Sequence, residues 1–245
     1  MWSSQSTTVF RRSKLSAIGQ FRVWLRATYP WILLYSIACD MSRDSLSNPI
    51  GDSLPLWAKI AYTIFLAVIV PAYWVKNGVA NFLWFSDIAL LVTGAALWLE
   101  SSLLASAMVI GVLLPESLWN VSYFGRLFTG ARISTLADYM FDARKSRFMR
   151  GLSLLMHVVM PVALVWMLAQ LGYDSRALLV QTGLAWVVLP VTYAVTDPAK
   201  NINWVFGLGH PPRRWLSPRA HLAMLMLGFP LLVYLPTHLL LRAIF

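Results

Sequence analysis

Charged side chains are scarce in this sequence, and their scarcity excludes most soluble folds. Only 12% of the 245 residues are Asp, Glu, Lys or Arg, whereas 58% are hydrophobic. A soluble domain carries about 25% charged and about 45–50% apolar residues. We therefore expect the chain to lie in a lipid bilayer.

Cysteine and short ligand motifs are also nearly absent. The single Cys39 can close no internal disulfide, which excludes a secreted disulfide scaffold. The sequence has no HxxxH or CxxC pair, no Gly-rich phosphate loop and no GxSxG motif. We therefore expect no metal and no cofactor. In a membrane protein, an excess of Lys and Arg mostly marks the loops that stay in the cytoplasm. The net charge of +10 therefore does not indicate nucleic-acid binding, and we expect no nucleic-acid partner.

Long apolar runs dominate the rest of the sequence. A helix needs about 20 apolar residues to span the hydrocarbon core, and such runs are too long for barrel strands. We predict an all-α, polytopic membrane helical bundle over residues 55–245. Its six long transmembrane helices are expected at residues 56–74, 81–99, 103–123, 152–171, 177–195 and 221–241.

Residues 1–54 form a basic N-terminal segment with a weaker apolar run at residues 24–39. If this run crosses the membrane, 16 basic residues lie on one side and 4 on the other, and otherwise the division is 11 against 9. The positive-inside rule thus favours a shorter seventh span, with the N-terminus in the cytoplasm. The alternative is an interfacial amphipathic helix, because Arg22 and Arg26 would share one polar stripe.

Polar residues of the predicted spans gather toward one side of the membrane. Ser86, Asp87 and His157 each lie about five residues into their runs, or roughly 7–8 Å deep at the rise of an α-helix. Polar groups at this depth usually face the bundle interior. Further polar residues at the same side are Glu116, Asn120, Asn201, Asn203, His210 and His221. We predict one polar cavity that opens toward the cytoplasmic interface.

Each of these residues also has a purely structural explanation. His157 could form an interhelical hydrogen bond, and Ser86 could be a small packing residue between helices. Asp87 could be a favourable charge near a helix N-terminus.

Three stretches carry a resemblance to a known family: FLWFSDIALL at residues 82–91, LSLLMH at residues 152–157, and NINWVFG at residues 201–207. Over roughly residues 56–240 the chain resembles six-span membrane acyl hydrolases and acyltransferases. This group includes the androgen-induced membrane hydrolases, a transmembrane phospholipid acyltransferase of ether-lipid metabolism, and uncharacterised bacterial integral membrane relatives. The resemblance implies that Ser86 takes the place of the Thr or Cys nucleophile and that His157 is the partner histidine. Bacterial relatives often carry a histidine just before the nucleophile, where this chain has Leu-Trp-Phe.

These residues permit a coherent chemistry for lipid esters. A serine hydroxyl needs an adjacent base, so His157 would activate Ser86. Asp87 or Asn201 would orient the imidazole. The candidate oxyanion and substrate contacts are Asn120, Asn201, Asn203 and His221. We expect lipid ester hydrolysis or acyl transfer near the cytoplasmic interface of a bacterial inner membrane, with membrane lipids as partners, anionic ones among them.

Two other classes of function fit the same sequence. In an ion- or proton-coupled transporter, Asp87, Glu100 and Glu116 would carry ions through the bundle. In a structural or anchoring subunit, the basic loop at residues 126–150 would dock a soluble or membrane partner subunit or anionic lipid.

Overall fold

The structure is a computed structural model, and it describes residues 54–209, 212–213 and 215–245. The predicted crossing at residues 24–39 lies outside the described residues.

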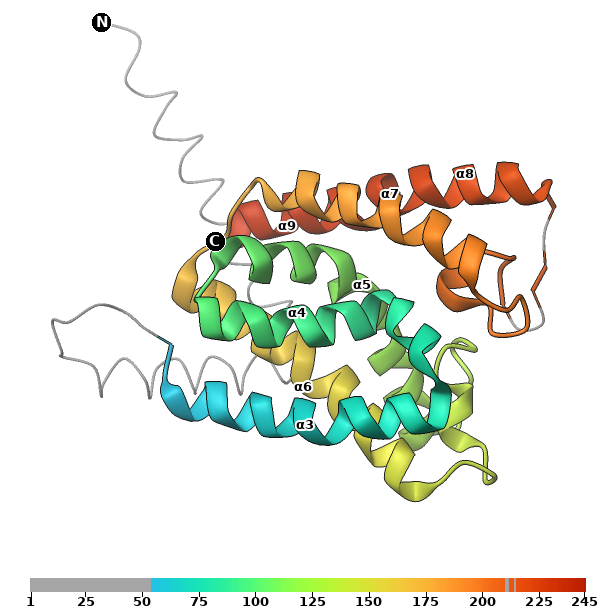
Figure 1. The fold of residues 1–245 in the computed structure, drawn as a ribbon, viewed down its shortest axis with the longest axis horizontal. Helices are drawn as coiled ribbons and strands as arrows, with labels where there is room; N and C mark the ends of the chain where they lie inside the picture. Colours follow the sequence, from blue (N-terminus) through green and yellow to red (C-terminus); the bar gives the residue numbers. More distant parts are fainter. Residues whose placement is uncertain (1–53, 210–211, 214) are drawn as a thin grey trace, which may run out of the picture. The chain divides into compact units, whose positions relative to one another are not determined.

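Helices make up most of the described chain (Figure 1). Their bounds are α3 Leu56–Asn77, η1 Val79–Leu83, α4 Phe85–Leu99, α5 Ser102–Thr129, η2 Asp138–Phe141, α6 Arg147–Leu171, α7 Ala177–Val195, η3 Ile202–Trp204, α8 Pro218–Gly228, η4 Phe229–Tyr234 and α9 Leu235–Ile244. The last three are continuous, with η4 a π-helical stretch. The described residues contain no β-strand beyond an isolated bridge between Leu208 and Arg213. The predicted all-α class is confirmed.

Five of the described helices are long and apolar enough to cross a membrane: Leu56–Asn77, Ser102–Thr129, Arg147–Leu171, Ala177–Val195 and Pro218–Ile244. The span predicted at residues 81–99 differs, because extended backbone at Trp84 divides it into η1 and the 15-residue α4. At about 1.5 Å per residue, α4 is roughly 22 Å long, shorter than the roughly 30 Å hydrocarbon core. The five long helices support a multi-pass membrane protein, but the predicted count of six long spans is not confirmed.

The helices of residues 54–245 run back and forth, so that three of their connections meet at one end (Figure 1). These connections are residues 78–84, 130–146 and 196–209, and we refer to them together as the three-loop end. The short turns at residues 100–101 and 172–176 lie at the opposite end. Those of the residues predicted to gather at one side of the membrane that the structure describes therefore lie toward one end of the bundle, and His210 lies outside the described residues.

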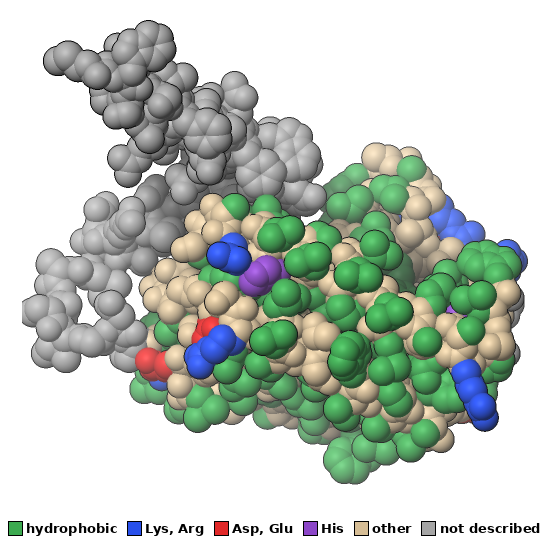
Figure 2. All heavy atoms as spheres, turned by 90° about the horizontal axis from the view of Figure 1, so that it is seen from above, with side chains coloured by type: hydrophobic (Ala, Val, Ile, Leu, Met, Phe, Trp, Pro, Cys, Tyr) green, Lys and Arg blue, Asp and Glu red, His purple; other side chains and the backbone are tan. Residues whose placement is uncertain are grey.

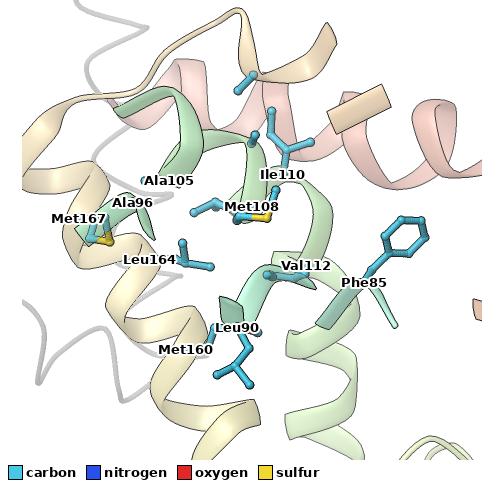
Figure 3. Close-up of a cluster of buried hydrophobic side chains, with 14 of the residues drawn as sticks. Phe85, Leu90, Ala96, Ala105, Met108, Ile110, Val112, Met160, Leu164 and Met167 are labelled. Carbon is cyan, nitrogen blue, oxygen red and sulfur yellow. The ribbon is translucent and has the colours of Figure 1, made fainter. Parts of the chain in front are cut away.

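Helix α5 is the centre of the core. It packs against α4, α6 and α7, and every residue from Ala105 to Val112 is buried. Figure 3 shows Leu90 of α4, Met108 of α5 and Leu164 of α6 in the same apolar cluster. Small residues let membrane helices approach closely. This apolar core fills the described bundle between the three-loop end and the opposite end.

The outer surface is apolar as well. Val75, Leu179 and Leu232 expose 87%, 78% and 75% of their surface. On the face in Figure 2, hydrophobic side chains cover the middle and charged ones gather toward the two ends. Such a belt suits helices that face lipid.

Candidate functional site

His157 is the centre of a buried polar network at the three-loop end. Its Nδ1 lies 2.6 Å from Oε2 of Glu116 on α5. Because an ionised carboxylate only accepts hydrogen bonds, we assign the proton to Nδ1. The indole of Trp119 stacks on the imidazole, with ring centroids 4.1 Å apart. Asn120 donates from Nδ2 to the backbone oxygen of His157 at 2.8 Å. Helix α5 thus fixes both the orientation and the tautomer of the imidazole.

The other imidazole nitrogen faces two hydroxyl groups. The Tyr139 hydroxyl lies 3.0 Å from Nε2 of His157 and 2.7 Å from Oγ of Ser153. Ser153 and His157 are four residues apart on α6, so their side chains share one helix face. We refer to Glu116, His157, Tyr139 and Ser153 as the His157 network. In this network a carboxylate, an imidazole, a phenol and a serine hydroxyl are connected in that order by hydrogen bonds.

Tyr139 reaches the network from η2, in the loop between α5 and α6. Burial raises the pKa of this phenol, so it stays protonated at neutral pH. Asp138 holds the loop by pairing with Arg126 at the end of α5, at 2.7 Å, and with Arg132. The Arg126 guanidinium also lies 4.4 Å from the ring centre of Phe141. The loop is therefore tied to α5, and this tie sets the position of the Tyr139 hydroxyl.

Asp87 lies in the first turn of α4, close to this network. Its Oδ2 accepts a hydrogen bond of 2.9 Å from Asn81 of η1, whereas its Oδ1 has no partner among the described residues. The carboxyl is near enough to Glu116 for the two groups to interact electrostatically. Tyr73 of α3 lies near both carboxyls and near Ser153. The structure thus brings Asp87 to the predicted polar cluster.

The roles predicted around the imidazole differ from the contacts observed. The carboxylate that orients His157 is Glu116, in place of Asp87 or Asn201. Both ring nitrogens are engaged, by Glu116 and Tyr139, and neither contacts Ser86. Ser86 is half-buried in the first turn of α4.

Asn203 connects the loop before α8 to the start of α4. Its Nδ2 donates to the Leu83 oxygen at 2.7 Å, and its Oδ1 accepts from the Phe85 amide at 3.1 Å. Asn203 itself has a left-handed backbone, with φ of 50°. Its amide is therefore a clamp on the turn before Ser86, where we predicted an oxyanion donor.

Asn201 and His221 are used in the same way. Asn201 donates from Nδ2 to the oxygens of Gly207 and Gly209, at 2.8 and 2.9 Å. The Nε2 of His221 lies 2.9 Å from the backbone oxygen of Trp204. Together with Asn120, these predicted substrate contacts hold backbone segments at the three-loop end in place.

Sequence reasoning missed the place of Tyr139 and Ser153 in the His157 network. The spacing of four residues between Ser153 and His157 is a signal that could have identified the serine. Tyr139 lies in a loop without a hydrophobic period, so no sequence pattern connects it to His157.

Glu100, a residue of the predicted ion path, lies at the opposite end. It forms an ion pair of 2.6 Å with Lys59, and Lys59 lies 5.8 Å from the ring centre of Trp98. Among the described residues, no group of three or more His, Cys, Asp or Glu side chains is placed to hold a metal ion.

Comparisons with protein-family models, with curated proteins and with solved structures find no match for this chain.

Proposed function

We propose that the protein is a membrane-embedded hydrolase or acyltransferase that acts on lipid esters at the three-loop end. The observation that carries the proposal is the His157 imidazole, held by Glu116 on one nitrogen and by a hydroxyl on the other. In the Ser-His-Asp arrangement of acyl transfer, an orienting carboxylate, an imidazole base and a hydroxyl follow one another in this order.

The network supports Ser153 as the nucleophile, with Tyr139 between the serine and the base. As Ser153 Oγ attacks the ester carbonyl carbon, its proton passes to the phenol oxygen, and the phenol proton passes to Nε2 of His157. Glu116 stabilises the resulting imidazolium. The proton returns by the same route to the alkoxide as the alkoxide departs, and Ser153 remains acylated. Water then releases the acid in a hydrolase, or the hydroxyl of a second lipid takes the acyl group in a transferase.

The depth of the network suits a lipid ester. Leu152 begins the predicted apolar run of α6. Ser153, the nucleophile, directly follows it at the boundary of the hydrocarbon core, and His157 lies five residues beyond Leu152, or about 7–8 Å farther in at the rise of an α-helix. Ester carbonyls lie at this boundary between headgroups and acyl chains. An apolar core lies behind the network (Figure 3). This core favours a site that opens at one end of the bundle, and it argues against a path for ions through the bundle.

Most of the basic residues of the described helices and loops lie in the three-loop end or on the helix ends next to it. Six basic and two acidic residues lie between positions 126 and 150. By the positive-inside rule, we place this end at the cytoplasmic face of a bacterial inner membrane, with the N-terminus also in the cytoplasm.

Labelling with a fluorophosphonate probe tests the activated serine. The full chain is purified in mild detergent, and labelling is compared among the wild type, Ser153→Ala, Ser86→Ala and His157→Ala, with the labelled residue found by mass spectrometry. We expect label on Ser153, loss of label in Ser153→Ala and His157→Ala, and retention in Ser86→Ala.

Label on Ser86 would overturn the assignment of Ser153 and return the nucleophile to the serine that the resemblance implies. A wild type that elutes as a single folded species and takes up no label would overturn the proposed function.

A further inference from the structure

A small pocket opens beside the His157 network. Its volume is about 200 Å³. It is lined by Tyr123 of α5, Met140 of η2, and Arg147, Arg150, Gly151 and Leu154 of α6. Met140 directly follows Tyr139 in the chain, and Gly151 and Leu154 flank Ser153. The pocket and the network are therefore built from the same three elements, α5, η2 and α6.

The two arginines give this pocket an uncompensated positive charge. Arg147 is exposed and makes no hydrogen bond or ion pair with the described residues. Arg150 uses one N–H to donate to the Met140 oxygen at 3.2 Å, which leaves the rest of its guanidinium available.

The acidic residues of the same loop are already paired elsewhere. Asp138 pairs with Arg126 and Arg132, and Asp142 pairs with Arg144. Neither carboxylate is left to neutralise the pocket arginines, so the pocket suits an anionic ligand.

The height of the arginines matches the layer of lipid headgroups. Arg150 and Arg147 precede Leu152, the start of the apolar run, by two and five residues, or roughly 3 and 7–8 Å along the helix axis. The headgroup layer on each side of the hydrocarbon core is about 5–8 Å thick. Lipid phosphates lie in this layer, and the planar guanidinium is well suited to binding phosphate oxygens.

We infer that the pocket lined by Arg147 and Arg150 binds the phosphate group of a glycerophospholipid. The volume agrees, because sites for whole drug-sized ligands occupy roughly 300–1,000 Å³, and this pocket holds only a headgroup fragment. Ser153 lies three residues beyond Arg150, about 4.5 Å deeper along α6. The ester carbonyls of a lipid lie deeper than its phosphate. If the proposed function holds, a phosphate held here presents an ester bond to the His157 network, which makes glycerophospholipids the substrate class.

A binding experiment that involves no catalysis tests this inference. The probe is a short-chain diether phosphatidate, which has a phosphate but no ester, and binding to the full chain in detergent is measured by calorimetry. Inorganic phosphate and the matching phosphate-free diether glycerol are the comparison ligands. Arg147→Gln and Arg147→Gln/Arg150→Gln are the test variants. Arg132→Gln is the matched control, because it removes one positive charge from the adjacent loop outside the pocket and leaves Asp138 paired with Arg126.

We expect the wild type to bind the diether phosphatidate at least tenfold more tightly than either comparison ligand. The single variant should lose about tenfold and the double variant more, since each substitution removes a charge-assisted hydrogen bond to the phosphate. Arg132→Gln should bind like the wild type.

Three results would overturn the inference. Equal binding of the diether glycerol would mean that the pocket does not recognise phosphate, and equal binding of inorganic phosphate would mean that it does not recognise a lipid. An equal loss in Arg132→Gln would mean that the general charge of the loop is responsible. Binding as expected in a protein that takes up no fluorophosphonate label would keep the phosphate site and reject only the catalytic function.

Discussion

Nδ1 of His157 lies 2.6 Å from Oε2 of Glu116, and this contact joins residues that are 41 positions apart in the chain. The carboxylate holds the tautomer in which Nε2 can act as a base. Glu116→Gln keeps the shape of the side chain and removes its charge. We expect the rate of fluorophosphonate labelling to fall about 10²–10⁴-fold, the range of effects for general bases and their orienting carboxylates.

The matched control for this prediction is Glu100→Gln. Glu100 also forms an ion pair of 2.6 Å, with Lys59, but at the opposite end of the bundle. The Glu100→Gln variant should be labelled by the fluorophosphonate at the wild-type rate. If Glu116→Gln labels at the wild-type rate while its melting temperature falls, the contact has a structural role alone.

Tyr139→Phe removes the hydroxyl between His157 and Ser153. It leaves both of them short of one hydrogen-bond partner, for which we expect a loss of about 1–3 kcal/mol in the free energy of unfolding. Labelling should fall at least tenfold, because the proton route from the serine is cut. Both quantities are measured on the same detergent-solubilised sample.

Tyr193→Phe is the comparison for this change. Tyr193 of α7 stacks on Phe206 with ring centroids 5.2 Å apart, and its hydroxyl makes no hydrogen bond to the described residues. The stability and labelling of this variant should be unchanged. Labelling in Tyr139→Phe that equals labelling in Tyr193→Phe would show that no proton passes through the phenol.

The sequence predicts the fold better than it predicts the site. Long charge-poor runs set the helices, since lipid offers no other partner for backbone groups. The run at residues 81–99 was predicted as one span and is broken at Trp84, where Asn203, more than a hundred residues away, holds the turn. No local sequence pattern predicts a contact from a residue so far away in the chain.

In the candidate site, too, the sequence predicts the features that depend on local sequence and misses those that depend on distant contacts. Depth along a helix is a local property, so His157, Asp87 and Asn120 were correctly grouped at one end. Pairing between side chains depends on helix rotation and on loop geometry. For this reason the choice of Glu116 as the partner of His157, and the arrival of Tyr139 from a loop, needed the structure.

Asn203 offers a way to separate backbone strain from side-chain bonding. Its φ of 50° is favourable for Gly and costly for Ala, by roughly 1–2 kcal/mol. Asn203→Gly removes only the two hydrogen bonds to the turn, whereas Asn203→Ala also adds the strain. We expect both to lower the melting temperature, and Ala to lower it further than Gly. Proteolysis within residues 78–84 should become faster in both.

Asn77→Ala is a suitable control, because the Asn77 side chain makes no hydrogen bond to the described residues. It should melt like the wild type and resist proteolysis equally. Equal melting of Asn203→Ala and the wild type would mean that the clamp contributes nothing to the start of α4.

Gly111 lets α5 and α7 approach each other. A Cβ at this position would overlap the buried side-chain amide of Gln181, whereas a Cβ at Gly183 meets nothing within 4 Å. We expect Gly111→Ala to lower the free energy of unfolding by about 1–3 kcal/mol, the usual cost of overpacking. Gly183→Ala should be neutral or stabilising by up to about 1 kcal/mol, because Ala favours the helix. Titration with a denaturing detergent measures both, and equal stability of the two variants would contradict the close approach of α5 and α7.

The orientation of the bundle can be measured with single cysteines. Cys39 is the one native cysteine, so Cys39→Ser gives a background without thiols. Ala143→Cys then places a thiol on the exposed loop between α5 and α6, and Ser175→Cys places one on the exposed turn at the opposite end. Because the loop between α5 and α6 is strongly basic, we expect it in the cytoplasm. A maleimide that cannot cross the membrane should therefore label Ser175→Cys in intact cells, and Ala143→Cys only after lysis. The reverse pattern would place the His157 network and the arginine pocket at the outer face, where the lipid substrates would have to come from the outer leaflet.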